Sequence, residues 1–172
     1  AVILPPDLNA PWLPLVRDSK QLTPEQREFL FPLIEECAMS IGVGQVPPEV
    51  IDAHGIMKAT KMAMCSAVRL LYPSPDFLLI DYLTLSELSL PQKGIVKGDS
   101  RCLSIACASI IAKVTRDRLM VELDELYPEY GFTRHKGYAT REHLSNLRRF
   151  GACPIHRKCF TPVTLAQRNR AT

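Results

Sequence analysis

The sequence predicts an α/β layered domain, and three observations carry this prediction. The apolar run at 77–80 ends in Asp81, which is typical of a strand covered by helices on both faces. Apolar residues recur at helical spacing in several segments, for example from Phe29 to Cys37. The 172 residues are 47% hydrophobic and 23% charged, so a disordered or collagen-like chain is excluded. Strands mixed with helices indicate layers around a hydrophobic core.

The N-terminal quarter of the chain is expected to hold a strand end, a loop and a helix. Residues 1–4 are an apolar run that stops at two prolines, as the end of a buried strand would, and 7–22 are predicted to be a loop. Thr23 and Gln26 form the pattern of a capping box, with a proline at the first helical position. Pro32 lies inside the helical pattern and is expected to kink or restart the helix.

The next segments predict a strand and two helices. Residues 41–46 alternate between apolar residues and glycine or glutamine, as a strand does. A short helix is expected to run through Asp52, and Gly55 should break it. A longer helix is then predicted at 56–71.

The C-terminal half is expected to be mainly helical. The longest helical pattern covers 103–126, and the segment 127–139 is predicted to be a loop rich in glycine, aromatic and basic residues. Thr140 is placed to cap a last helix that extends to about Arg149. Gly151 is well placed to end that helix.

Charge is distributed unevenly along the chain. Residues 1–91 hold six basic and eleven acidic residues, whereas residues 92–172 hold fifteen and seven. The stretch 131–172 carries nine basic residues and a single acid, Glu142. Such asymmetry indicates a polyanionic partner, although a solvated face with a basic tail would give the same pattern.

Cysteine usage predicts reduced thiols in a cytoplasmic protein. No two cysteines form a C-x-x-C pair, and no histidine stands at zinc-finger spacing from a cysteine pair. We also expect no signal peptide and no membrane association, since the opening apolar run is too short and no apolar run approaches ~20 residues. The six cysteines are Cys37, Cys65, Cys102, Cys107, Cys153 and Cys159.

Two aspartates are candidate metal ligands. Asp81 ends the predicted strand 76–81, and Asp99 follows a shorter predicted strand at 95–97. Open α/β sheets place their sites at the carboxyl ends of strands. Two carboxylates there would suit Mg²⁺ or Mn²⁺, which prefer carboxylate oxygen. The alternative is that both aspartates only cap turns.

A basic loop is the second candidate site. His135, Lys136 and Tyr138 lie on a glycine-containing loop ahead of a predicted helix, a composition that suits phosphates and a sugar or base face. Lys20 is a further phosphate candidate. The alternative is a surface turn whose tyrosine packs on the core.

Ser100 allows a weaker hypothesis, a serine hydrolase. A serine nucleophile would need a base such as His135 or His143 and an orienting acid. No G-x-S-x-G nucleophile elbow occurs in the sequence.

Taken in order, several motifs resemble one known family, the bacterial ribonuclease HII family. The resemblance runs from residue 1 to about residue 163. The helix motif and the H-K-G-Y loop are the most specific parts. The segments are D-S-K at 18–20, I-D at 80–81, K-G-D-S at 97–100, L-S-I-A-C-A-S-I-I-A-K-V-T-R-D at 103–117, Y-G-F-T-R-H-K-G-Y at 130–138 and P-I-H-R at 154–157.

The resemblance implies a fold and an activity. The fold would be an RNase H-like layered fold with a mixed sheet, as a single domain over residues 1–172 with a basic helical extension from about 131. The activity would be endonucleolytic cleavage of the RNA strand of RNA–DNA hybrids, and of duplex DNA at embedded ribonucleotides. Two divalent cations, Mn²⁺ or Mg²⁺, would serve the hydrolysis, which leaves a 5′-phosphate and a 3′-hydroxyl. The protein would be a monomer that acts in DNA replication and repair.

The resemblance also assigns roles to residues. Asp81 and Asp99 match two catalytic metal ligands of the family, and Tyr138 matches the tyrosine that stacks at the RNA–DNA junction. Lys20 matches a lysine near the active-site phosphates. The remaining expected substrate contacts are Ser104, Lys113, Arg116, His135 and Lys136.

Three departures from the family pattern bear on activity. The family carries D-E-A-G-R-G just before the A-V-I-L of residues 1–4, and this first strand, with two further metal ligands, is absent from the 172 residues. The chain by itself is therefore expected to be inactive or impaired, and a non-catalytic nucleic-acid-binding protein is the alternative. Tyr82 and Ala139 stand where the family usually has glycine, and both could reshape the site locally.

Overall fold

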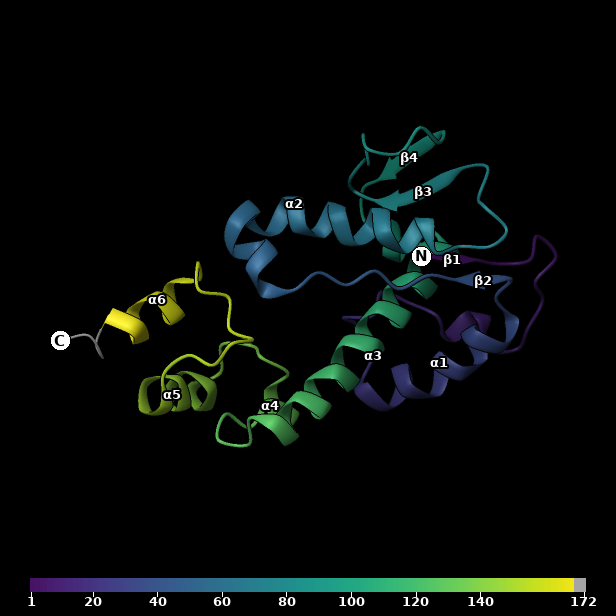
Figure 1. Cartoon of the computed structure of the whole chain (residues 1–172). Helices are drawn as coiled ribbons and strands as arrows, with labels where there is room; N and C mark the ends of the chain where they lie inside the picture. Colours follow the sequence, from purple (N-terminus) through teal and green to yellow (C-terminus); the bar gives the residue numbers. More distant parts are fainter. Residues whose placement is uncertain (169–172) are drawn as a thin grey trace. The chain divides into compact units, whose positions relative to one another are not determined.

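The computed structural model describes residues 1–168, and its backbone contacts divide them into two compact units (Figure 1). The first unit comprises residues 1–45 and 61–114, and the second comprises residues 46–60 and the chain from residue 115 on. Helices and small sheets together confirm the predicted α/β class. That the chain forms a single domain stays a prediction.

Two short strands, β1 (Val2–Ile3) and β2 (Ser40–Ile41), form an antiparallel pair in the first unit. The strand predicted at 41–46 is therefore wrong beyond its first residue. Glycine explains the difference: a Cβ on Gly42 would lie 2.0 Å from a backbone oxygen of the helix beside it, and one on Gly44 would lie 1.9 Å from another. The alternating pattern thus reflects close approach to a helix.

Helix α1 (Pro24–Cys37) follows a loop that contains the short 3₁₀ helix η1 (Leu13–Leu15). The capping box of Thr23 and Gln26 is confirmed, since each side chain accepts a hydrogen bond from the backbone of the other residue. The restart expected at Pro32 is wrong, because one continuous helix includes it, and a kink there stays a prediction. Pro32 lies on the exposed face, and burial of the opposite face holds the helix together. The buried residues of α1 are Arg27, Leu30, Phe31 and Ile34.

Strands β3 (Leu78–Asp81) and β4 (Gln92–Ile95) form a parallel pair, with Asp81 opposite Ile95. Only one face of β3 is buried, since Leu79 is 43% exposed, so the expectation of burial on both faces is wrong. The strand predicted at 95–97 also lies earlier than expected. Lys97 adopts a left-handed conformation that ends β4 before the 3₁₀ helix η2 (Gly98–Ser100).

Two long helices run from one unit into the other. Helix α2 (Pro48–Arg69) is two helical segments joined at Gly55, whose φ of 77° is not helical, as the sequence predicts. Helix α3 (Leu103–Leu126) has the predicted bounds. Its N-terminal half packs into the main core of the first unit, which consists of Trp12, Leu22, Leu30, Phe31, Ile34, Cys107, Ile110, Ile111 and Val114.

The second unit contains three further helices, α4 (Phe132–His135), α5 (Arg141–Phe150) and α6 (Thr161–Arg168). Thr140 caps α5 and Gly151 follows its end, as predicted. The short α4 lies inside the segment expected to be a loop, and α6 follows the helix that was expected to be the last. None of the helices in residues 1–168 combines the length and the apolar character needed to span a membrane.

Candidate active site

Asp81 and Gly98 meet at the carboxyl end of β3. Oδ1 of Asp81 accepts a hydrogen bond of 2.7 Å from the backbone N–H of Gly98. A Cβ at residue 98 would lie 3.3 Å from the Cα of Asp81 and 2.7 Å from Cδ1 of Ile105. A residue with a Cβ at this position would force Ile105 or β3 to shift, so glycine favours the close approach of η2 to β3. The approach brings the next residue, Asp99, to the same end of the strand.

Asp99 is buried and is paired with a lysine from a distant loop. Its Oδ2 lies 3.1 Å from Nζ of Lys20, whose side chain is 77% exposed. This hydrogen bond raises the pKa of Lys20 above its usual value, and the charges of Asp18, Asp99 and Asp81 act in the same direction. Three carboxylates therefore act on one ammonium group.

The loop that carries Lys20 is fixed by two residues that sequence reasoning missed. Arg27, buried in α1, donates hydrogen bonds to the backbone oxygens of Ser19 and Leu22, at 2.8 and 2.6 Å. Oγ of Ser109 in α3 accepts a hydrogen bond of 3.3 Å from the N–H of Ser19. Two features of the sequence could have identified these residues: a charged residue on the buried face of α1, and a serine in the apolar half of α3.

The donor chemistry of this site suits a divalent cation. Within residues 1–168, Oδ2 of Asp81 and Oδ1 of Asp99 accept no hydrogen bond, so each carboxylate keeps one oxygen available. Residues 1–168 contain no group of three or more histidine, cysteine or acidic side chains that could hold a metal. A pair of carboxylates is nevertheless a common protein contribution to a Mg²⁺ site, which water and substrate phosphates complete.

Tyr82, which stands where the family usually has glycine, has an unusual backbone conformation. Tyr82 has a φ of 62°, in the left-handed region that glycine adopts without strain, and its ring is exposed. Ala139 does not adopt a positive φ. Of the two departures, only Tyr82 therefore has a backbone conformation that favours glycine. That either residue reshapes the site stays a prediction.

The H-K-G-Y loop in the second unit holds an exposed tyrosine and a buried histidine. The ring of Tyr138 is 57% exposed, and the guanidinium of Arg116 lies 5.2 Å from its centre. Nη2 of Arg116 also donates to the backbone oxygen of Lys136 at 3.0 Å. His135 is only 6% exposed, and its ring nitrogens contact backbone atoms of Tyr130 and Gly137. The alternative interpretation of this loop, a surface turn whose tyrosine packs on the core, is therefore wrong.

Ser104 and Lys113, the remaining predicted contacts, lie on α3. The hydroxyl of Ser104 lies 3.3 Å from the sulfur of Cys102, and both Ser104 and Lys113 are half-buried. The serine-hydrolase hypothesis finds no support, because both nitrogens of His135 and both of His143 contact other groups of the second unit, which leaves neither histidine a nitrogen for a serine.

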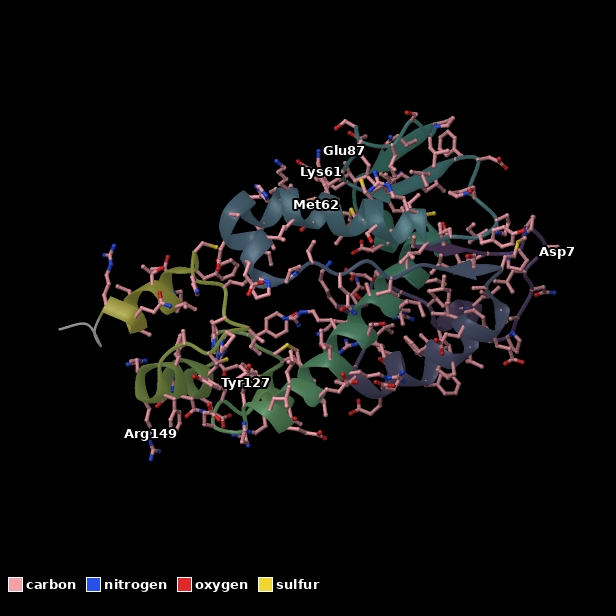
Figure 2. The ribbon with its side chains drawn as sticks, viewed as in Figure 1. Asp7, Lys61, Met62, Glu87, Tyr127 and Arg149 are labelled. Atoms are coloured by element: carbon pink, nitrogen blue, oxygen red, sulfur yellow. The ribbon has the colours of Figure 1, made fainter. Side chains whose placement is uncertain are left out.

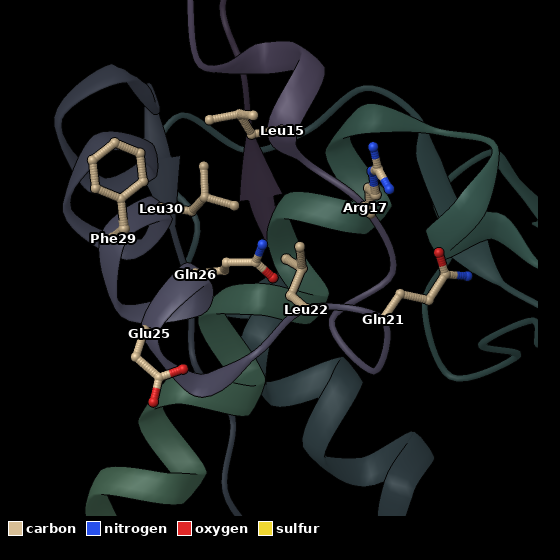
Figure 3. A pocket seen from close by; sticks show the side chains of 8 residues that line it. All are labelled: Leu15, Arg17, Gln21, Leu22, Glu25, Gln26, Phe29 and Leu30. Carbon is tan, nitrogen blue, oxygen red and sulfur yellow. The ribbon is translucent and has the colours of Figure 1, made fainter.

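The first unit contains a pocket that none of the predicted site residues lines (Figure 3). It is formed by the loop before α1 and one side of that helix. Its lining residues are Leu15, Arg17, Gln21, Leu22, Glu25, Gln26, Phe29 and Leu30.

Comparisons with known proteins agree with these motifs. The sequence profile of the family described as "Ribonuclease HII" matches residues 13–163. The chain belongs to the ribonuclease HII family. Curated ribonucleases HII from Dehalococcoides mccartyi and Geobacillus thermodenitrificans are 55% and 56% identical to it over 163 residues. These matches cover 95% of this chain, and 77% and 61% of the two relatives.

The fold also matches a solved structure of the same type. The crystal structure of the ribonuclease H2 from Pyrococcus horikoshii is similar to this chain with a TM-score of 0.77 and 26% sequence identity. The match covers 94% of this chain and 87% of the other. The RNase H-like fold that the resemblance implied is therefore confirmed.

Proposed function

We propose that this protein is an endoribonuclease that cleaves the RNA strand of RNA–DNA hybrids and cuts duplex DNA at embedded ribonucleotides. The observation that carries the proposal is the approach of Asp81 and Asp99 around Gly98, with Lys20 on Asp99, in a chain that belongs to the ribonuclease HII family. Hydrolysis would leave a 5′-phosphate and a 3′-hydroxyl.

Asp81 and Asp99 would hold divalent cations, Mg²⁺ or Mn²⁺, through their available oxygens. Cations bound there would supply activation of water and stabilisation of the leaving oxygen. Lys20 would balance the charge of Asp99 and, because it is largely exposed, would also contact a substrate phosphate. Ser104 and Lys113, half-buried on α3, are proposed as further phosphate contacts.

The basic second unit is proposed as a nucleic-acid-binding surface. Arg149 on α5 extends away from the ribbon (Figure 2). Burial lowers the pKa of Arg157, and the positive charge of Arg116 lowers it further, so two guanidinium groups lie close enough to repel each other. A phosphate would relieve this repulsion. The exposed basic residues of the described part of this unit are Lys58, Arg118, Arg134, Arg141, Arg148, Arg149, Lys158 and Arg168.

The guanidinium of Arg116 is a further candidate contact for a phosphate. Its buried Nη1 has no hydrogen-bond partner within residues 1–168, and the nearest acidic oxygen, on Asp117, is 3.8 Å away. Buried donors of charged groups are costly to leave unpaired. The Arg116 side chain as a whole is 38% exposed, so its guanidinium can contact a group outside the chain. We propose a substrate phosphate for Arg116 and a backbone phosphate for Lys136. The exposed ring of Tyr138 would stack at the ribonucleotide junction, and His135, being buried, would support the loop.

The experiment is cleavage of a DNA duplex that contains one ribonucleotide. For this test we join the 172 residues to a preceding segment that carries the family's D-E-A-G-R-G motif, and we use the term full-length protein for that product. We expect it to cleave 5′ of the ribonucleotide in Mg²⁺ or Mn²⁺, and a DNA polymerase should extend the 3′-hydroxyl product without phosphatase treatment. Asp99→Asn should abolish cleavage.

Two outcomes would contradict the proposal. They are a full-length protein that does not cleave, and a product that a polymerase extends only after its 3′-phosphate is removed. The 172-residue chain alone is expected to cleave weakly or not at all, since two of the four carboxylates that the family resemblance implies are not among its residues. Robust cleavage by that chain would show that Asp81 and Asp99 suffice.

A further inference from the structure

Three histidines are buried together behind the H-K-G-Y loop, all within the second unit. His135, His143 and His156 are exposed by only 6%, 8% and 6%. The proposed function gives one of them, His135, no more than a supporting role and uses neither of the others. They come from separate segments, namely α4, the first turn of α5 and the loop before α6. Buried histidines are usually explained by the hydrogen bonds they make.

The hydrogen bonds of two of these histidines form one continuous chain. The backbone N–H of Cys153 lies 3.1 Å from Nδ1 of His156. Nε2 of His156 lies 3.1 Å from Nε2 of His143. Nδ1 of His143 lies 2.9 Å from the backbone oxygen of Tyr138. The chain therefore begins at a backbone donor and ends at a backbone acceptor.

These end points fix where each proton lies. The oxygen of Tyr138 can only accept, so Nδ1 of neutral His143 must carry its proton and Nε2 must accept. His156 must then donate from Nε2, which leaves its Nδ1 as the acceptor for the N–H of Cys153. Every donor has one acceptor, and a single assignment of tautomers satisfies the whole chain.

Aromatic packing holds the rings in this arrangement. The ring of His135 stacks on that of His143 at 4.5 Å with an interplanar angle of 11°. Phe132 meets the rings of His135 and His143 edge-on, at 5.9 and 5.5 Å. The ring of His156 lies 4.8 Å from that of Tyr130. Neither linked ring can turn without losing these contacts.

We propose that His143 and His156 are positioning residues, which fix the backbone of Tyr138 by a directed hydrogen-bond chain and so aim its exposed ring at the substrate. The inference rests on the proposed function for the contact between Tyr138 and the ribonucleotide. The hydrogen-bond chain itself is a property of the folded protein that can be measured without substrate.

The loop needs such a support because its own backbone is unusual. Lys136 and Gly137 both have positive φ, 49° and 78°, just before the tyrosine. Lys136 is in the left-handed conformation, where a residue with a Cβ is disfavoured by roughly 1–2 kcal/mol. Thr140 accepts a hydrogen bond from the N–H of His143, so the start of α5 is linked to the same loop. His143 therefore connects a rigid helix to a strained turn.

Neutral rings are what this chain requires, and burial favours them. Burial lowers the pKa of His143 below its usual value, and the neighbouring His135 lowers it further. Burial, followed by the charge of His143, lowers the pKa of His156 to about 4. Both rings are therefore neutral at neutral pH, and each has one donor and one acceptor nitrogen.

Two amide substitutions at His143 separate the two links. In His143→Asn the side-chain NH₂ can take the place of Nδ1 and donate to the oxygen of Tyr138, but the link to His156 is lost. In His143→Gln the amide reaches the place of Nε2, but the donor to Tyr138 is lost. Both replace an imidazole by an amide, so they are matched in polarity. His54→Gln, on an exposed part of α2, is the control for histidine substitution as such.

The first measurement needs no substrate. Long-range ¹H–¹⁵N spectra of the histidine-labelled 172-residue chain at neutral pH should show His143 protonated at Nδ1 and His156 protonated at Nε2. The opposite tautomer at either ring would overturn the inference. This test stands whether or not the variants fold well.

The second measurement is cleavage of the single-ribonucleotide duplex by the full-length protein. We expect His143→Gln to lower kcat/KM about tenfold or more, because a small misplacement of a positioned group is costly. His143→Asn should stay within about threefold of wild type, and adding Tyr138→Ala to His143→Gln should cause little further loss. Equal losses in the Asn and Gln variants would overturn the positioning role.

The failure of the two proposals can be told apart. If Tyr138→Ala cleaves like wild type, the contact between Tyr138 and the ribonucleotide is wrong, and the tautomer measurement alone then decides whether the hydrogen-bond chain exists. If Tyr138→Ala is impaired and His143→Gln is not, the proposed contact stands and the positioning role is overturned.

Discussion

The backbone nitrogen of Gly98 lies 2.7 Å from Oδ1 of Asp81, and this hydrogen bond joins the two segments that carry the candidate metal ligands. It holds one oxygen of Asp81 in place and leaves the other available. Because the donor is a backbone group next to Asp99, a change in the position of Gly98 moves both carboxylates together.

Gly98→Ala is therefore expected to lower both stability and cleavage. The added Cβ would lie 2.7 Å from Cδ1 of Ile105 and 3.3 Å from the Cα of Asp81. Overpacking of this kind costs about 1–3 kcal/mol, which urea denaturation would measure. Ile105→Val removes the closer contact, so combining it with Gly98→Ala should recover part of the lost stability. If the double variant is no more stable than Gly98→Ala alone, the strain does not come from the contact with Ile105.

Tyr82→Gly is expected to stabilise the protein. A tyrosine at a φ of 62° is strained by roughly 1–2 kcal/mol, whereas glycine loses about 0.5–1 kcal/mol to the entropy of the unfolded chain. The net gain should be between zero and about 1.5 kcal/mol in the free energy of unfolding. Tyr82→Ala keeps the Cβ and removes only an exposed ring, so it is the matched control and should not stabilise. If both variants behave alike, the backbone at residue 82 is unstrained.

Local patterns in the sequence were sufficient for much of the fold. The capping box at Thr23, the break at Gly55 and the cap at Thr140 were predicted correctly because each depends on residues within one or two turns. Strand β4 was misplaced because its residues Gln92–Ile95 are mostly polar and are held by pairing with β3. That pairing depends on the segment that connects the two strands, and it gives the sequence of β4 no periodic pattern.

The candidate site shows the same limit. That Asp81 and Asp99 follow strand-like runs was visible in the sequence, and the family resemblance supplied their expected role. The pairing of Lys20 with Asp99 joins residues 79 positions apart, and the histidine chain joins segments with no common motif. Tertiary contacts of this kind follow from packing, which periodicity and capping signals do not encode.

Lys20→Ala is expected to impair cleavage with little change in stability. Lys20 is 77% exposed, so its ion pair with Asp99 adds no more than about 1 kcal/mol to the free energy of unfolding. Removal of the ammonium also takes away a phosphate contact, so KM for the duplex should rise. Lys93→Ala, an exposed lysine on β4 in the first unit, is the matched control. The proposal fails if both variants keep the wild-type KM.

Lys136→Ala and Tyr138→Ala should affect duplex binding in different ways. Loss of one phosphate contact should reduce the log–log salt dependence of affinity by about one unit and weaken all duplexes alike. Loss of the ring should cost roughly 1–3 kcal/mol of stacking and reduce cleavage at a ribonucleotide junction more than duplex affinity. Binding titrations at several salt concentrations, with and without a ribonucleotide, distinguish them. An unchanged salt slope in Lys136→Ala would exclude its phosphate contact.

The buried histidines predict how stability depends on pH. The pKa of His156 is lowered to about 4, mainly by burial, so below pH ~6.5 the unfolded chain binds a proton that the folded protein does not. The free energy of unfolding should therefore fall as the pH drops from about 7 towards 4, by roughly 3 kcal/mol from this group. His143, whose pKa is also lowered, adds to the effect.

His156→Gln isolates that contribution. Glutamine can donate to Nε2 of His143 but does not titrate. The free energy of unfolding of this variant should therefore depend less steeply on pH than that of wild type between about 4.5 and 7. Urea denaturation at several pH values would show this. The titratable groups that face His156 are His143, the thiol of Cys153, whose pKa burial raises, and Tyr130. Of these only His143 is a base whose ordinary pKa lies in this range, and burial lowers that pKa. A slope equal to wild type in His156→Gln would mean that His156 binds protons equally in both states, which its burial and its single acceptor nitrogen argue against.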